Sequence, residues 1–169
     1  MQLTSLEAIT RAFDEADVPF IVVGGLAVVA HGYGRQTQHL EIVIPLQPEA
    51  VRGAFRALGM LGYQPRVPVT AEGFADPEQR ARWTEAKGMT VLNFHSEKHF
   101  GTPVDVFVTE PFDFNEEYRR SMVEEIAPGA PVHILRLGTL LRLKREAGRP
   151  QDLADIAELS LLHGRDSNG

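Results

Sequence analysis

The stretch FIVVGGLAVVAHGYGRQTQHLEIVIP, residues 20–45, carries the clearest pattern in the chain. Short apolar runs alternate with glycines, which predicts regular elements joined by tight turns. Five elements are expected in order: a strand at residues 20–23, a turn at Gly24 and Gly25, a buried helix at 26–31, a glycine-rich loop at 32–34 and a strand at 40–44. This strand–helix–strand unit is the centre of the predicted fold.

The second of these strands carries two ionisable residues, His39 and Glu41, at alternate positions of an apolar run. Side chains two residues apart on a strand point to the same face, so an imidazole and a carboxylate are expected side by side. Burying such groups costs free energy unless they have partners or a use. We therefore expect the chemistry of the protein on this face.

Composition sets the limits of the fold and of its partners. The 169 residues are enough for one domain with a proper core, expected at residues 1–164 with a frayed tail at 165–169. A net charge of −6 argues against non-specific nucleic-acid binding, and the lack of cysteine excludes disulfides and thiolate metal sites. No signal peptide and no membrane-spanning apolar run is evident, so a cytoplasmic location is expected.

The remaining elements are expected on both sides of this unit. Thr4 and Glu7 have the spacing of a capping box at the start of an amphipathic helix that ends before Asp17. Further helices are predicted at residues 51–58, 77–87, 115–120, 137–147 and 150–162, and strands near 63–64 and at 89–95, 104–109, 123–126 and 132–135. The strands at 89–95 and 104–109 are expected to form an antiparallel hairpin. The order predicts an α+β fold, a mixed sheet flanked by helices with a C-terminal helical pair.

These features together resemble the minimal nucleotidyltransferase superfamily, which includes DNA polymerase β and small antibiotic-modifying and toxin-like enzymes. In that family a strand, a Gly-Gly or Gly-Ser turn and a short helix precede a strand with Asp-x-Asp, and a later strand carries a third carboxylate. Gly24 and Gly25 match the turn, GYGRQT matches the loop before the acidic strand, and Asp105 in VDVFV stands at the third carboxylate. The run LKREAGRPQDLADIAEL, residues 143–159, looks like the lysine-plus-aspartate element of the subgroup with abortive-infection toxins.

The resemblance breaks at the metal motif. Where the family has Asp-x-Asp, this chain has His39, Leu40 and Glu41. Mg²⁺ prefers oxygen ligands, whereas an imidazole nitrogen suits Mn²⁺ or Zn²⁺ better. The motif is therefore changed at its first position and lengthened by one methylene at its second.

The resemblance implies roles for nine residues. They are, as catalytic groups, Glu41, Asp105 and Asp152; as substrate-binding groups, Gly24, Gly25, Arg35, Thr37 and Lys144; and as metal ligands, His39, Glu41 and Asp105. Most of them have a purely structural alternative. The glycines fit any tight strand-to-helix turn, Lys144 fits a side chain whose stem covers the core, and Asp152 fits a first helical turn, where the dipole favours a carboxylate.

Two function classes remain open at this point. The first is a nucleotidyltransferase-like protein that binds a nucleoside triphosphate with Mg²⁺ or Mn²⁺ and transfers a nucleotidyl group to a hydroxyl of RNA, protein or a small molecule, with turnover weakened by His39. The second is a catalytically inactive relative that binds a nucleotide or a partner. An antitoxin-type protein is a candidate partner, as the toxin-like resemblance implies.

Overall fold

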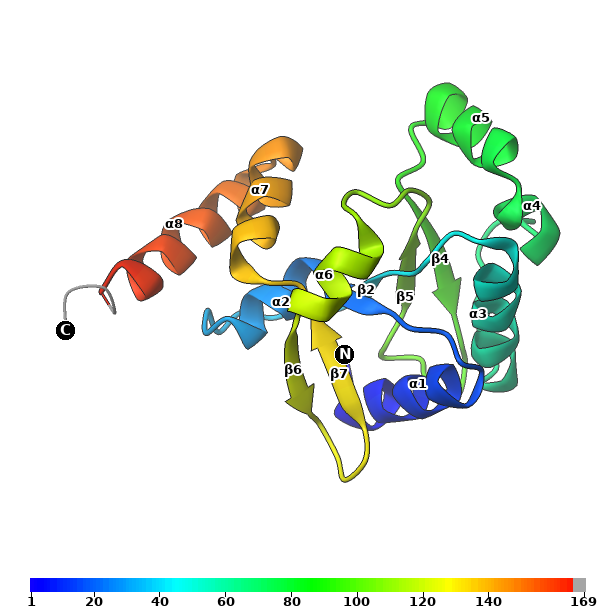
Figure 1. Cartoon of the computed structure of the whole chain (residues 1–169), viewed down its shortest axis with the longest axis horizontal. Coiled ribbons are helices and arrows are strands. Elements are labelled where there is room, and N and C mark those ends of the chain that lie inside the picture. The colour runs from blue at the N-terminus through cyan, green and yellow to red at the C-terminus, as the bar shows by residue number, and fades with distance from the viewer. Residues whose placement is uncertain (166–169) are drawn as a thin grey trace.

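The computed structural model describes residues 1–165 of the chain (Figure 1). Its helices are α1 (Leu3–Glu15), α2 (Gly24–Ala30), α3 (Pro48–Met60), α4 (Ala71–Ala75), α5 (Pro77–Lys87), α6 (Phe114–Arg120), α7 (Leu137–Ala147) and α8 (Pro150–Arg165). Its strands are β1 (Ile21–Val23), β2 (Leu40–Val43), β3 (Gln64–Pro65), β4 (Val91–His95), β5 (Val104–Phe107), β6 (Met122–Glu125) and β7 (Pro131–Ile134). None of the helices in this part of the chain is long and apolar enough to cross a membrane.

The strands form one mixed sheet in the order β3-β4-β5-β2-β1-β7-β6. Strand β1 pairs antiparallel with β2 and parallel with β7, and β2 pairs parallel with β5. The hairpin expected from residues 89–109 is present, because β4 and β5 pair antiparallel. The predicted α+β class with a mixed sheet, flanking helices and a C-terminal helical pair is therefore confirmed.

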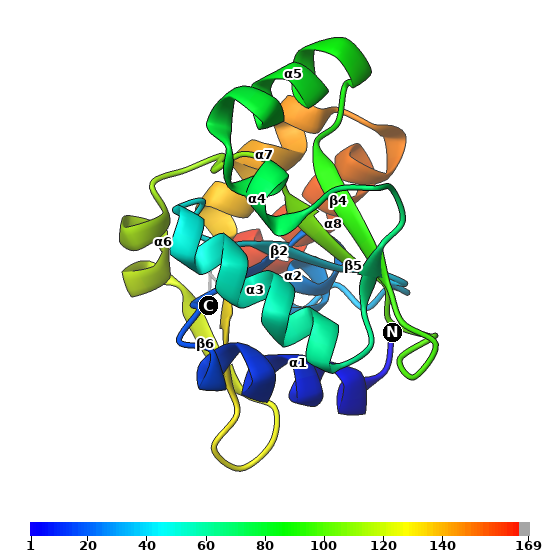
Figure 2. The same cartoon turned by 90° about the vertical axis from the view of Figure 1, so that its right-hand side faces the viewer.

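One face of the sheet is the main core of the molecule. In Figure 2, α1 and α3 lie in front of the sheet, and α7 and α8 lie behind it. The side chains that point to the α1 and α3 side alternate along the central strands and are buried: Leu40, Ile42, Leu92, Phe94, Val104 and Val106. Helix α3 is anchored there by Phe55, whose ring centroid lies 5.2 Å from that of Phe94. Strand alternation therefore leaves the other face of these strands for polar groups.

That other face carries a row of three polar side chains. Asp105 of β5 pairs in register with Glu41 of β2 on one side and with Asn93 of β4 on the other. Residues in register on neighbouring strands point to the same face, so the three side chains lie in line across the sheet. Asp105, which the resemblance assigned to a later strand, therefore lies directly beside Glu41.

Three local predictions need correction, and one helix was not predicted. Gly24 and Gly25 are the first two residues of α2 and not a separate turn before it. Gln2, and not Thr4, is the N-cap of α1, because the Gln2 carbonyl accepts the first helical hydrogen bond, from the Leu6 N–H; the Gln2 N–H itself donates to Thr102 Oγ1 at 2.8 Å. His39 lies just before β2, since backbone pairing with β5 begins at Leu40. Helix α4 was not predicted, although its Phe74 is fully buried.

The C-terminal tail expected at residues 165–169 is only partly described. Helix α8 runs one residue into it, to Arg165, and residues 166–169 lie outside the described part of the chain.

Candidate functional site

A cleft of about 450 Å³ lies over the polar row of the sheet. Its walls are the turn at Gly25, the loop before β2, and the facing ends of α7 and α8. The lining residues are Gly25, Arg35, Gln36, Thr37, Gln38, His39, Glu41, Asp105, Lys144, Arg149, Gln151 and Asp152. The residues that the sequence nominated thus converge on one place, except that Gly24 lines an adjoining pocket.

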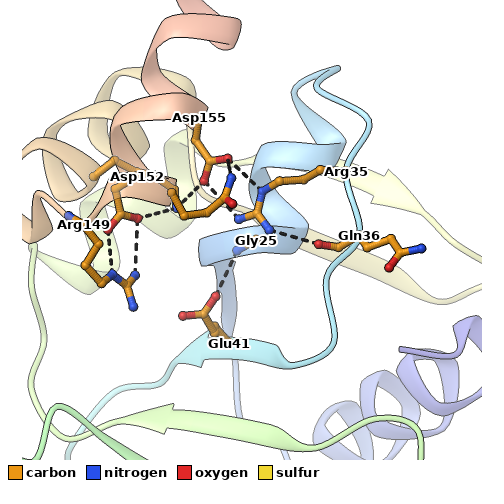
Figure 3. Close-up of polar contacts among 9 residues, drawn as sticks. Gly25, Arg35, Gln36, Glu41, Arg149, Asp152 and Asp155 are labelled. Atoms are coloured by element: carbon orange, nitrogen blue, oxygen red, sulfur yellow. Dashed lines mark hydrogen bonds and ion pairs between the residues drawn. The ribbon is translucent and has the colours of Figure 1, made fainter.

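Glu41 binds the glycine turn in this structure. Its Oε2 accepts a hydrogen bond from the Gly25 backbone N–H at 2.9 Å (Figure 3). The first free N–H of a helix carries a partial positive charge, which a carboxylate stabilises. The Glu41 carboxylate therefore already occupies the glycines where the resemblance implies that the substrate binds.

The two glycines are also required by the packing around the turn. Gly24 has a φ of +62°, and a Cβ added there would overlap the Glu41 carboxylate. A Cβ on Gly25 would lie 2.6 Å from Thr37 Oγ1 and 3.2 Å from Arg35 Nη2. The packing of the protein therefore accounts for a glycine at both positions, whether or not a substrate binds.

Asp105 is engaged on both of its oxygens. His39 Nδ1 donates to Asp105 Oδ2 at 2.8 Å, and Asn93 Nδ2 donates to Oδ1 at 2.5 Å. Arg66 Nε extends this row of hydrogen bonds by donating to Asn93 Oδ1 at 2.6 Å. His39 therefore contacts the third carboxylate across the cleft and is not paired with Glu41 as a strand neighbour.

The metal ligands implied by the resemblance do not form a coordination set in this arrangement. Among residues 1–165, no three or more His, Asp or Glu side chains gather closely enough to hold a metal ion. One oxygen of Glu41 accepts from Gly25, and both oxygens of Asp105 accept, from His39 and from Asn93. As arranged, His39, Glu41 and Asp105 do not fit Mg²⁺.

Lys144 lies in a buried network of charges behind the cleft. Its Nζ is 2.8 Å from Asp152 Oδ1 and 2.8 Å from Asp155 Oδ2. The lysine is only 5% exposed, and the two aspartates are 1% and 0% exposed. The Lys144 ammonium is therefore buried and enclosed by two carboxylates.

Two arginines complete this network (Figure 3). Arg35, from the loop before β2, pairs with Asp155 at 2.8 Å, and Arg149, between α7 and α8, pairs with Asp152 at 2.7 Å. Three cations thus surround two buried carboxylates, which leaves one positive charge in excess. The Arg149 side chain is 70% exposed, so it is the cation of the network most accessible from solvent.

The network lowers the pKa of both aspartates. Burial alone would raise the pKa of Asp152, but hydrogen bonds and charge from Arg149 and Lys144 outweigh burial and lower that pKa to about 2. The pKa of Asp155 is lowered in the same way, since hydrogen bonds from Lys144, Gln151 and Arg35 outweigh its burial. Both aspartates are therefore ionised at neutral pH.

A second, mostly apolar pocket of about 310 Å³ adjoins the cleft. It shares Glu41, Lys144, Arg149 and Asp152 with the cleft. Its remaining walls are Val23, Gly24, Phe107, Leu140, Leu143, Glu146 and Ala147. A charged cleft and an apolar pocket therefore lie next to each other.

Sequence reasoning missed three members of this site. Asn93 is a polar residue within the apolar strand VLNFH, the same signal that singled out Glu41. Asp155 follows Asp152 by three residues, which places both on one face of a helix. Arg149 gave no signal, because its position between two helices becomes informative only once those helices are folded.

We predict that Lys144→Met lowers the free energy of unfolding by about 3–5 kcal/mol, because it leaves two buried carboxylates without their shared cation. Arg145→Met removes an exposed cation from the next position of the same helix and is expected to change stability by about 0.5 kcal/mol at most. Urea unfolding at pH 7 measures both. Equal effects of the two substitutions would contradict a structural role for Lys144.

We also predict a loss of stability in acid. The folded-state pKa of Asp152 is about 2, below its ordinary value of 3.8, so its stabilising contribution is complete above about pH 4 and is lost as the pH falls through about 2. This contribution is about 2 kcal/mol. Arg149→Ala removes the first of the groups that lower this pKa, so the acid transition should move to higher pH. Urea unfolding between pH 6 and 2.5 tests this, and an unchanged transition would contradict it.

Comparison with solved structures places this arrangement among known folds. The chain is similar to ANT(2″)-Ia in a crystal structure with adenylyl-2″-tobramycin, with a TM-score of 0.60 and 14% identity over 98% of this chain and 91% of that chain. A solution structure of ANT(2″)-Ia gives a TM-score of 0.57 and 15% identity over 98% and 85% of the two chains. The lincosamide antibiotic adenylyltransferase LnuA, bound to lincomycin, gives a TM-score of 0.54 and 14% identity over 88% of this chain and 89% of that chain.

No family model matches the chain, and no curated protein matches its sequence. At 14–15% identity, likeness in structure carries information about fold and not about activity. The two solved proteins are antibiotic nucleotidyltransferases of nearly the same length as this chain. This chain therefore has a nucleotidyltransferase-like fold.

Proposed function

We propose that the chain binds a nucleoside triphosphate in the cleft over β2 and β5, and that its nucleotidyl transfer with Mg²⁺ is weak. The observation that carries the proposal is the Arg149 guanidinium, which lies at the rim of the cleft and is 70% exposed. The Nε and Nη2 donors of Arg149 are bonded to Asp152, so phosphate oxygens would be bound by the remaining N–H groups on the Nη1 side of the guanidinium. Lys144 and Arg35 lie behind Arg149 and add positive charge to the same wall.

The adjoining apolar pocket supports binding of a whole nucleotide. A base and sugar need apolar walls with a few polar groups, and the pocket offers Phe107, Leu140 and Leu143. Because the pocket and the cleft share Arg149 and Lys144, a nucleoside in the first places its phosphates in the second.

The polar row supports weak transfer. His39 stands at the first position of the metal motif and holds Asp105, whose other oxygen is held by Asn93. Phosphoryl-type transfer depends on divalent metals bridging the phosphate oxygens. Glu41 and Asp105 remain the candidate catalytic carboxylates, but with these partners they do not offer the shared set of oxygens that such a metal requires.

Other roles implied by the resemblance are reassigned in this proposal. Asp152 holds Lys144 and Arg149 in place instead of acting on an acceptor hydroxyl, because both of its oxygens accept hydrogen bonds from cations. Thr37 and Gly25 stay candidate contacts to the phosphates, since both line the cleft. A phosphate at Gly25 must displace the Glu41 carboxylate.

We predict that Arg149→Ala weakens triphosphate binding roughly tenfold to a hundredfold, the loss of one charge-assisted hydrogen-bonded pair. Isothermal titration with ATP, GTP, CTP and UTP in EDTA, Mg²⁺ or Mn²⁺ measures this. Arg145→Ala is the matched control, because this exposed arginine lies on α7 outside the lining of the cleft. Absence of binding of all four nucleotides in all three conditions would contradict the proposal.

We predict that the native chain transfers a nucleotidyl group slowly or not at all with Mg²⁺, and that His39→Asp raises the rate. The substitution frees Asp105 from the imidazole and restores an oxygen donor at the first motif position. Transfer of label from α-labelled NTP to tobramycin or lincomycin, and release of pyrophosphate, are compared for both chains with Mg²⁺ and Mn²⁺. Rapid Mg²⁺-dependent transfer by the native chain would contradict weak turnover while leaving nucleotide binding standing.

A further inference from the structure

A hydrogen-bonded series of four side chains runs along the polar face of the sheet and ends in the cleft. Arg66 Nε donates to Asn93 Oδ1 at 2.6 Å, and Asn93 Nδ2 donates to Asp105 Oδ1 at 2.5 Å. His39 Nδ1 lies 2.8 Å from the other oxygen of Asp105. Asp105 and His39 line the cleft, whereas Arg66 and Asn93 lie outside its lining. The series therefore supports the cleft from one side.

The direction of each hydrogen bond in this series follows from its first member. A guanidinium only donates, so the Asn93 atom that faces Arg66 is the amide oxygen. The Asn93 amide nitrogen is thereby turned to Asp105, whose carboxylate accepts from it. An ionised carboxylate only accepts, so the His39 Nδ1 that faces Asp105 carries a hydrogen. The neutral His39 ring therefore has its lone pair on Nε2.

The other ring nitrogen of His39, Nε2, is free in this structure. Among residues 1–165, the His39 ring has no hydrogen-bond partner besides Asp105. The His39 side chain is 46% exposed, whereas the Asp105 side chain beneath it is only 13% exposed. An imidazole that is held through Nδ1 and free at Nε2 is arranged to take a proton at Nε2, as a general base does. His39 lines the same cleft as Arg149.

We propose that His39 is a general base, and that the slow nucleotidyl transfer of this chain proceeds through it without a divalent metal. The inference rests on the proposed nucleotide binding and goes beyond it, because it gives a catalytic role to the residue that changes the metal motif. Asp105 holds the imidazole in the required tautomer and stabilises the imidazolium that forms. Asn93 holds Asp105, and Arg66 holds Asn93.

The proposed step moves one proton and exchanges one bond at phosphorus. His39 Nε2 takes the proton of the acceptor hydroxyl, or of water, as the acceptor oxygen forms a bond to the α-phosphorus. The bond from the α-phosphorus to the oxygen that bridges to the β-phosphate breaks, and pyrophosphate leaves with the electron pair. The Arg149 guanidinium, at the wall of the cleft, offers positive charge to the phosphates. The proton on His39 is then lost to solvent, which restores the base.

The donor set of the site favours a base over a metal ligand at this position. Both oxygens of Asp105 already accept hydrogen bonds, and His39 offers a nitrogen where Mg²⁺ prefers oxygen. The structural alternative is that the pair only joins the loop before β2 to β5. The two roles are separated by a substitution that removes the base and keeps the hydrogen bond to Asp105.

Turnover is measured in EDTA and in Mg²⁺ with each of the four α-labelled NTPs, with water alone and then with tobramycin or lincomycin as acceptor. The native chain should release pyrophosphate with labelled NMP or labelled acceptor at the same rate in both conditions. His39→Asn keeps an N–H for Asp105 but has no base, so the rate in EDTA should fall about a hundredfold to ten-thousandfold. His95→Asn, at an exposed histidine on β4 outside the lining of the cleft, is the matched control and should leave the rate unchanged.

Two further variants distinguish a base from a structural residue. His39→Ala should regain part of its rate in EDTA in proportion to added imidazole, because the free imidazole replaces the missing base. His39→Asp should lose turnover in EDTA while it gains turnover with Mg²⁺, so that the metal dependence of the two chains is opposite. A purely structural histidine would show no rescue by imidazole.

Isothermal titration of the same samples with nucleotide tells two kinds of failure apart. A native chain that binds a nucleotide but shows no turnover in EDTA would overturn the metal-free base and leave the proposed nucleotide binding standing. Turnover in EDTA that survives unchanged in His39→Asn would have the same consequence. A native chain that binds no nucleotide would overturn both proposals.

Discussion

The ion pairs of Lys144 with Asp152 and Asp155 are the interaction on which the rest of the site depends. They join α7 to α8, and through Arg35 they tie the loop before β2 to the same pair of helices. The wall of the cleft is therefore built from side chains far apart in sequence and held by charge. The cost of this arrangement is that the network needs all its members, because a buried carboxylate without its cation is strongly unfavourable.

Much of the fold could be predicted because its signals are local. The strand at residues 40–43, the hairpin of β4 and β5, and the common face of Glu41 and Asp105 follow from alternation and order along the chain. The start of α1 could not be predicted, since Gln2 makes no side-chain cap and its backbone N–H is bonded to Thr102, a residue 100 positions away. Helix α4 was missed because five residues carry too little periodicity, although the burial of Phe74 gives it a firm anchor.

The candidate site, like the fold, could be predicted only in part. The sequence placed the nominated residues in one region, but it could not assign the partner of each side chain. For Lys144 the sequence left two roles open, a phosphate ligand or a stem over the core. The choice between them depended on Asp155, which the folded structure brings next to the Lys144 Nζ. His39 likewise was expected beside Glu41, whereas the start of β2 at Leu40 turns it towards Asp105. Contacts between charges belong to tertiary structure, and a pattern of residue types does not specify them.

The charge network and the apolar surface of α8 are two sides of one constraint. A helix has a single rotation about its axis, so ion pairs that bring Asp152 and Asp155 inward necessarily turn Leu153 and Leu161 outward. Turning α8 over would expose Leu159, which is buried on the same side as the aspartates, and it would separate Lys144 and Arg35 from their carboxylates. The fold therefore keeps these charges inside, and the exposure of Leu153 and Leu161 is the consequence.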